Sequence, residues 1–233
     1  MSKKHIPAQA NHRCMQGAPG KDQKHQWDET YKQKEFFGSE PSELGLRALQ
    51  VFKERGVRKV LELGCGQGRD TWLFLRNGMS VTALDYSETG VCYMRDRSKE
   101  MKLDKSFVIE VQDVRNGIPL PDGSFDAVYS HMFFTMEMTE AEISAIMKEC
   151  LRVLRPAGLN IFSVRNFHDP HYGKFTPRGE DMYENPMGFV VHFFDESKVM
   201  RVSKGYELEW IREFDDTSPP FVKKLYEVVL RKP

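Results

Sequence analysis

Val60-Leu61-Glu62-Leu63-Gly64-Cys65-Gly66-Gln67-Gly68 is the stretch that decides the fold, because it places a glycine-rich loop directly after a short apolar run. Glycine permits a tight turn and lets a ligand lie against bare backbone. A glycine triplet alone is equally typical of a plain strand-to-helix turn. Its meaning therefore depends on the residues around it.

On both sides of the loop, β-rich runs alternate with helical patterns, which is typical of a mostly parallel sheet covered by helices on both faces. The predicted strands are 59–63, 80–84, 107–111, 125–130 and 159–164, and the predicted helices are 41–55, 70–77, 89–101 and one that Thr139 and Glu142 open with a capping box. Two last strands, 207–214 and 225–231, have no helix between them, so we expect them to pair as an antiparallel unit at one edge. A short helix capped by Asp195 should precede them, after a loop over 166–188.

The composition restricts the class of protein. Lysine plus arginine equals aspartate plus glutamate at 34 each, so no net charge of one sign draws the chain to nucleic acid or to anionic membranes. The four cysteines have no paired spacing, and no apolar run reaches the roughly 20 residues that span a bilayer. We expect a cytoplasmic protein, monomeric or homodimeric, that binds neither nucleic acid nor membrane.

The expected organisation is a flexible tail over residues 1–24 and a single domain over 25–233. Within the domain, 25–56 should form an N-terminal helical cap and 57–164 the cofactor-binding core. Residues 165–233 should supply a substrate-covering loop and the last strands.

Acidic residues follow the predicted strands where a nucleoside would lie. Asp85 ends the second strand, where a carboxylate can accept both ribose hydroxyls, and Asp113 with the backbone NH of Val114 suits an adenine ring. The loop spacing is G-x-G-x-G with Glu62 beside it, whereas dinucleotide binders use G-x-G-x-x-G to hold a pyrophosphate. A carboxylate there would repel phosphate but suits S-adenosylmethionine, which carries a sulfonium and an ammonium.

In this order of motifs, residues 60–164 resemble the class I, Rossmann-like S-adenosylmethionine-dependent methyltransferases. The matching segments are 60–68, 81–87, 108–115, 125–130 and 154–164, the last with Ala157 where the family usually has glycine. A looser resemblance, through Trp27, Tyr31, 68–70 and the C-terminal strands, is to tellurite-resistance-type small-molecule methyltransferases. The resemblance implies an α/β fold, a three-layer α/β/α sandwich with a seven-stranded, mostly parallel sheet of order 3-2-1-4-5-7-6 and an antiparallel last strand.

The resemblance assigns Glu62, Gly64 and Gly66 to the methionine end of the cofactor, Asp85 to its ribose and Asp113 to its adenine. The full set of candidate cofactor-binding residues is Tyr31, Glu62, Gly64, Cys65, Gly66, Gly68, Asp85, Tyr86, Ser87, Asp113, Val114 and Ser130. Candidate acceptor-binding residues follow the fourth and fifth strands, because ligands of such sheets bind at the carboxyl ends of the strands; they are Phe133, Phe134, Arg165, His168, His171 and Tyr172.

The expected reaction is methyl transfer to a small molecule bearing a thiol, oxyanion or hydroxyl. The segment 130–133 lacks the Asp/Asn-Pro-Pro-aromatic signature of adenine-amino methyltransferases and the paired glutamates of protein-arginine methyltransferases. For a hydroxyl acceptor, His131 is the candidate general base, although a histidine after a strand also occurs as an ordinary loop residue. A thiolate or oxyanion would need no base.

Two further groups have more than one interpretation. His168, Asp169 and His171, with His192, invite a metal site, but their spacing matches no zinc pattern, so we expect no metal and a loop that covers the substrate. The aromatic residues Trp27, Tyr31, Phe36 and Phe37 can close over the cofactor, with Tyr31 the best candidate, or simply pack the first helix onto the sheet.

Two other functions remain open at this point. An NAD-dependent oxidoreductase on a related fold is disfavoured by the loop spacing and by Glu62. A non-catalytic S-adenosylmethionine-binding sensor or partner subunit would keep the same cofactor residues, and no acceptor-side residue in the sequence distinguishes it from an enzyme.

Overall fold

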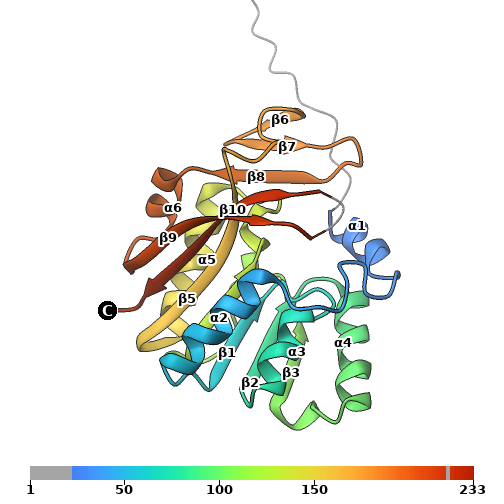
Figure 1. Ribbon diagram of the computed structural model, residues 1–233, viewed down its shortest axis with the longest axis vertical. Coiled ribbons are helices and arrows are strands. Elements are labelled where there is room, and N and C mark those ends of the chain that lie inside the picture. The colour runs from blue at the N-terminus through green and yellow to red at the C-terminus, as the bar shows by residue number, and fades with distance from the viewer. Residues whose placement is uncertain (1–22, 219–220) are drawn as a thin grey trace, which may run out of the picture.

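The computed structural model describes residues 23–218 and 221–233 and has three layers, with a twisted central sheet between two layers of helices (Figure 1). The predicted tail lies outside the described residues, apart from Gln23 and Lys24. These two residues begin a helix, α1 (Gln23–Thr30), that the sequence analysis did not delimit.

The central sheet has the predicted topology. Its parallel strands are β1 (Lys59–Leu63), β2 (Ser80–Asp85), β3 (Phe107–Val111), β4 (Phe125–His131) and β5 (Leu154–Asn166), in the order β3-β2-β1-β4-β5. Next to β5, β10 (Lys223–Arg231) runs antiparallel, and β9 (Glu207–Asp216) pairs antiparallel with β10. The α/β class, the order of these seven strands and the edge hairpin are therefore confirmed.

The strand count was predicted too low, because the segment after β5 contains three more strands. They are β6 (Thr176–Gly179) and β7 (Met182–Glu184), inside the predicted loop over 166–188, and β8 (Val190–Phe194), directly after it. β8 pairs in parallel with the last two residues of β5, beyond the point where β4 has ended, and β7 and β6 follow as an antiparallel extension. Figure 1 shows this three-stranded unit above the carboxyl ends of the central strands.

Helices cover both faces of the sheet, as the alternating pattern predicted. α2 (Glu43–Glu54), α3 (Arg69–Arg76) and α4 (Glu88–Glu100) share one buried cluster, and α5 (Glu140–Val153) and α6 (Glu196–Val202) share the other. Short 3₁₀ turns lie at Asp104–Ser106, Val114–Asn116 and Phe133–Thr135. The predicted capping box of Thr139 and Glu142 and the Asp195 cap are both present.

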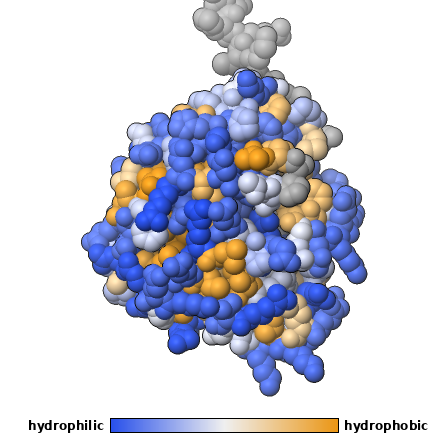
Figure 2. Space-filling view, in the orientation of Figure 1, coloured by the Kyte–Doolittle hydropathy of each residue, from blue (hydrophilic) through white to orange (hydrophobic). Residues whose placement is uncertain are grey.

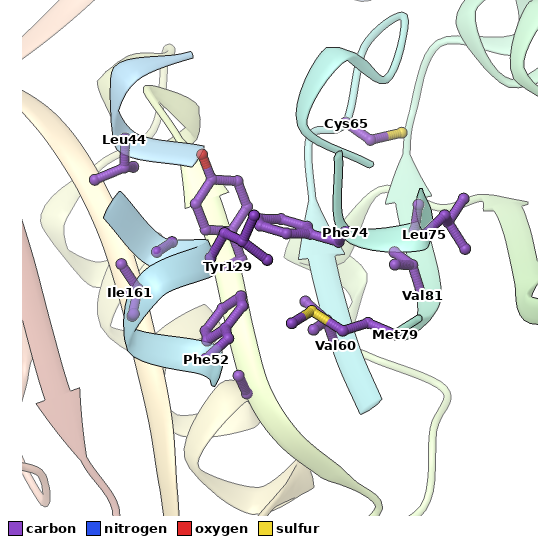
Figure 3. Close-up of a cluster of buried hydrophobic side chains, with 14 of the residues drawn as sticks. Leu44, Phe52, Val60, Cys65, Phe74, Leu75, Met79, Val81, Tyr129 and Ile161 are labelled. Carbon is purple, nitrogen blue, oxygen red and sulfur yellow. The ribbon is translucent and has the colours of Figure 1, made fainter. Parts of the chain in front are cut away.

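A buried tyrosine ties the first cluster to the carboxyl end of the sheet. The ring of Tyr129, on β4, packs edge-on against Phe74 at 5.0 Å between ring centroids, and Phe74 contacts Phe52 (Figure 3). The Tyr129 hydroxyl donates to Asp70 Oδ2 at 2.7 Å, and Asp70 also accepts from the backbone NH and the hydroxyl of Ser42. This network joins the starts of α2 and α3 to β4.

We expect Tyr129→Phe to lower the free energy of unfolding by about 1–2 kcal/mol, because it removes a donor to a buried carboxylate while keeping the ring. Urea denaturation measures this change. Tyr93→Phe, at a half-buried position on α4, is the matched control. Its free energy of unfolding should be within about 0.5 kcal/mol of that of the wild type.

The surface in the view of Figure 2 has no broad apolar face. Its hydrophobic residues form separate patches between hydrophilic ones. Isolated exposed apolar side chains are normal on folded domains. Among the residues that the structure describes, none of the helices has the length and apolar character needed to cross a bilayer.

Candidate active site

A cavity of about 310 Å³ lies at the carboxyl ends of β1, β2 and β4, where ligands of open α/β sheets bind. α1 and the turn after β4 complete its walls. Twelve of the predicted site residues line it: Tyr31, Glu62, Gly64, Cys65, Gly66, Gly68, Asp85, Tyr86, Asp113, Val114, His131 and Phe133. The structure thus brings most of the candidate cofactor residues to one place.

The glycine loop requires glycine at two positions. Gly64 and Gly66 have φ values of +66° and +54°, in the left-handed region that other residues adopt at a cost. A Cβ on Gly64 would lie 2.6 Å from Cδ2 of Phe133, and one on Gly66 would lie 2.8 Å from the hydroxyl of Tyr31. The loop is therefore in close contact with two aromatic side chains that approach from α1 and from the turn after β4.

Glu62 is a buried acid at the start of this loop. Its Oε2 accepts a hydrogen bond of 2.6 Å from the hydroxyl of Thr71. Burial, with the nearby charges of Asp70 and Asp85, raises the pKa of Glu62 to about 8. The carboxyl group is thus largely protonated at neutral pH in the absence of a cation, and a cationic ligand beside it would favour the carboxylate.

If a ligand ammonium binds beside Glu62, affinity should increase with pH up to about 8, because binding must remove the proton that the free protein holds. For a pKa of about 8, S-adenosylhomocysteine should bind about twentyfold more tightly at pH 7.5 than at pH 6.0. Calorimetric titration at the two pH values measures the ratio. In Glu62→Gln the ratio should approach one, and an undiminished ratio in that variant would assign the effect to another group.

Asp85 holds the other side of the loop. One carboxylate oxygen accepts from the backbone NH of Gly66 at 2.8 Å, and the other accepts from that of Ser87 at 2.9 Å. Burial raises the pKa of Asp85, opposed by these two donors. Each oxygen keeps a second lone pair, so the side chain can still accept two hydroxyl groups from a ligand.

Asp113 is already engaged by a neighbour. The guanidinium of Arg115 pairs with both of its oxygens, with contacts of 2.6–3.1 Å, and holds the pKa of Asp113 below its usual value. Both residues line the cavity beside Val114. A ligand amino group at Asp113 would therefore share the carboxylate with Arg115, which the sequence analysis did not identify.

Nδ1 of His131 contacts a protein group, and Nε2 is buried. Nδ1 lies 2.8 Å from the hydroxyl of Ser163, whereas Nε2 lies 3.7 Å from Oδ2 of Asp216 and has no hydrogen-bond partner. Although burial opposes its ionisation, nearby His131, Ser218 and Lys223 keep the pKa of Asp216 well below its usual value. Because Nε2 is buried and Nδ1 contacts Ser163, no nitrogen of His131 is directed at an acceptor in this conformation.

The other predicted site residues do not line the cavity. Ser87 caps α4 and donates to Asp28, while Ser130 and Phe134 are buried beneath the site. Arg165 forms a buried ion pair with Asp169. The remaining three lie in the segment that follows β5. His168 pairs with Glu213, His171 contacts Arg165, and Tyr172 stacks on Phe167.

The candidate metal ligands are dispersed among these contacts. His192 lies apart, between the carbonyl of Met138 and the ammonium of Lys198. Within residues 23–218 and 221–233, no three histidine, cysteine, aspartate or glutamate side chains converge as they would around a metal ion.

Sequence reasoning missed the helix α1 and its support, because α1 lines the cavity and packs against the turn between β7 and β8. Gln23 and Gln26 donate to the carbonyls of Val190 and Gly188, and Trp27 packs on Phe189 at 5.1 Å between ring centroids. On the other side, Asp28 accepts from Ser87 and Thr89 at the start of α4. The i, i+4 spacing of Trp27 and Tyr31, whose rings stack at 5.5 Å, was the one signal in the sequence for this helix.

Other lining residues were also missed, chiefly Arg69, Gln112, Met132, Met136 and Met138. Arg69 donates to the carbonyl of Phe37 at 3.4 Å and forms no ion pair with a carboxylate of the described residues, so it supplies a positive charge beside the glycine loop. The site therefore combines close backbone approach, two buried acids and one guanidinium without an acidic partner. This set fits S-adenosylmethionine, which carries a ribose, two cationic groups and one carboxylate.

The comparisons with known proteins agree with this geometry. Residues 60–158 match the family model described as a methyltransferase domain. The chain is 33% identical over 121 residues to a probable S-adenosylmethionine-dependent methyltransferase of Mycobacterium tuberculosis, a match that covers 52% of this chain and 40% of the relative. The chain spans about half the length or less of the curated relatives it matches.

Two solved structures share the fold at low sequence identity. One is the 1,6-didemethyltoxoflavin-N1-methyltransferase of Burkholderia thailandensis, with S-adenosylhomocysteine bound, at a TM-score of 0.68 and 17% identity over 90% of this chain and 87% of that one. The other is TehB of Haemophilus influenzae, at a TM-score of 0.62 and 19% identity over 80% of this chain and 62% of that one. Residues 60–158 are thus similar to a methyltransferase domain, and the two solved structures share the fold of most of this chain.

Proposed function

We propose that this chain transfers the methyl group of S-adenosylmethionine to a small-molecule acceptor that bears a thiol, an oxyanion or a hydroxyl. The observation that carries the proposal is the convergence of the glycine loop, Glu62, Asp85 and Asp113 on one cavity at the carboxyl ends of the parallel strands. The cofactor supplies an activated methyl on a sulfonium. The protein's part is to hold acceptor and cofactor in line and to exclude water.

Each group in the cavity has an expected role. Asp85 accepts the ribose hydroxyls, Glu62 faces the ammonium, and Arg69 is the available partner for the carboxylate of the methionine moiety. Gly64 and Gly66 allow the cofactor to lie against backbone. Asp113 and Val114 are expected at the adenine. Because His131 has no free nitrogen facing the cavity, the proposal does not depend on a general base.

Two observations favour a small acceptor over a polymer. One wall of the cavity is α1, which Gln23, Gln26 and Trp27 hold against the β7–β8 turn and the start of β8, so an acceptor must fit beside the side chains of that helix. The chain also has equal numbers of acidic and basic residues, which offers no general attraction for a nucleic acid.

The test is methyl transfer from methyl-labelled S-adenosylmethionine to a panel of thiols, phenols, amines and oxyanions such as selenite and tellurite. The wild type should label at least one acceptor, and Asp85→Ala should label none above background. A protein that binds S-adenosylhomocysteine but labels no member of the panel would favour a non-catalytic sensor instead.

A further inference from the structure

We propose that the acceptor is a flat, apolar molecule that presents a thiol, and that it binds in the part of the cavity lined by Trp27, Phe37, Met132, Phe133, Met136 and Met138. We call this part the acceptor chamber. The inference rests on the proposed function and specifies its acceptor. It depends on three features: the chemistry of the chamber walls, a strained turn that directs two wall side chains into the chamber, and the absence of a base directed at the chamber.

The walls are aromatic rings and thioethers. Trp27 contacts Tyr31, Phe37 and Phe189, with centroid separations of 5.5, 6.0 and 5.1 Å, so its ring is fixed from several sides. Three methionines from the segment after β4 line the same cavity. Such surfaces favour flat, polarizable ligands through stacking and contacts between sulfur and rings. They offer little to a strongly hydrated anion.

The backbone of Met132 is strained, and this strained turn positions the side chains of Met132 and Phe133. Its φ and ψ are +54° and 15°, in the left-handed region that residues with a Cβ rarely adopt. The strain is held by hydrogen bonds from the Met132 NH to Ser163 Oγ at 3.0 Å and from the Thr135 hydroxyl to the Met132 carbonyl. Strained residues of this kind gather at functional sites. Here the turn lets Met132 and Phe133, which are adjacent in sequence, both line the cavity.

Among the described residues that line the cavity, the groups that could act as a base are occupied or buried, apart from Glu137. Nδ1 of His131 contacts Ser163 and Nε2 is buried, and Asp70 already accepts from Ser42 and Tyr129. Burial raises the pKa of Tyr31, whose hydroxyl is therefore no base near neutral pH. Glu137 lines the cavity at an exposed position, and the Glu137→Gln variant below tests whether it acts as a base. The acids Glu62, Asp85 and Asp113 have expected roles at the cofactor.

If no base of the protein takes the proton, the acidity of the acceptor itself decides whether it reacts. A phenol or alcohol stays largely protonated near neutral pH and would need a group to take its proton, whereas a thiol ionises by itself in this range. The thiol proton leaves to solvent before the reaction. The thiolate sulfur then forms a bond to the methyl carbon as the carbon–sulfonium bond breaks, and the products are a methyl thioether and neutral S-adenosylhomocysteine.

The main experiment measures the pH dependence of kcat/KM for thiophenol and for phenylmethanethiol, with phenol and aniline as comparators of similar shape. We expect both thiols to be methylated, with phenol and aniline at least a hundredfold slower. The midpoint of each pH profile should follow the ionisation of that thiol, so thiophenol, the more acidic, should have the lower midpoint. In His131→Asn and Glu137→Gln the midpoint for each thiol should equal that of the wild type, even if the maximal rate changes.

The opposite outcomes overturn the proposal. If phenol or aniline reacts as fast as the thiols, or if both thiols share one midpoint that moves in His131→Asn or Glu137→Gln, a base of the protein controls the reaction. If phenols, amines or oxyanions are methylated and the thiols are not, the thiol inference fails while the proposed function stands. If nothing is methylated, the proposed function itself fails.

A binding measurement tests the chamber without turnover. Thiophenol should quench the tryptophan fluorescence of the complex with S-adenosylhomocysteine, because Trp27 lines the chamber, and Trp27→Phe should remove most of this quenching. In Met132→Gly, glycine tolerates the backbone angle but the thioether wall is lost, so the Kd for thiophenol should rise about tenfold. S-adenosylhomocysteine should bind within twofold of the wild type. Met187→Gly, at an exposed turn position, is the matched control; equal quenching in all variants would place the thiol elsewhere.

Discussion

Asp85→Ala is expected to weaken the binding of S-adenosylhomocysteine by about two to four orders of magnitude. The side chain is the only buried carboxylate at the end of β2 among the described residues, and it has one free lone pair on each oxygen for a ribose hydroxyl. Hydrogen bonds to a charged group contribute roughly 1.5–3 kcal/mol each, and two of them give the stated range. The change also removes the acceptor of the Gly66 and Ser87 NH groups, which loosens the loop.

Isothermal titration calorimetry measures this loss, and thermal unfolding verifies that the variant is folded. Asp96→Ala is the control, because Asp96 is an exposed carboxylate on the outer part of α4, and its affinity should equal that of the wild type. A folded Asp85→Ala protein that binds the ligand as tightly as the wild type would remove Asp85 from the site.

Gly64→Ala should have the second-largest effect. The structure offers a matched control in Gly56, which has the same φ of +66° but nothing within 4 Å of an added Cβ. Both alanine variants should lose about 1–2 kcal/mol of stability from the left-handed backbone. Only in Gly64→Ala does the new methyl group meet Phe133, at 2.6 Å from Cδ2, so only that variant must displace the ring or the loop.

We therefore expect Gly64→Ala to bind S-adenosylhomocysteine at least a hundredfold more weakly, and Gly56→Ala to bind it normally. Calorimetry on both proteins, at a temperature where each is folded, separates the local clash from backbone strain. Equal affinities in the two variants would show that the contact between Gly64 and Phe133 does not shape the cofactor site.

The central sheet was predictable from sequence because each of its signals is local. The predicted bounds of the first and third strands, 59–63 and 107–111, are those of β1 and β3, and the glycine loop follows β1 directly. Loops that follow parallel strands meet at one edge of the sheet, so Glu62, Asp85 and Asp113 could be grouped before their positions were known.

The acceptor side was less predictable because its contacts are long-range. β6 and β7 are strands of four and three residues in a segment rich in glycine, proline and tyrosine, and they are held through β8, which pairs with the end of β5. No sequence rule links α1 to the β7–β8 turn, some 160 residues away. Similarly, the contact of His131 with Ser163 and Asp216 depends on the pairing of β4, β5, β9 and β10.

The most direct test of the account is a crystal structure of the protein with S-adenosylhomocysteine. We predict one ligand in the cavity, with both ribose hydroxyls within hydrogen-bonding distance of Asp85, the adenine beside Asp113 and Val114, and the amino group toward Glu62. A ligand bound elsewhere, or one whose ribose does not contact Asp85, would contradict the assignment of this cavity to S-adenosylmethionine.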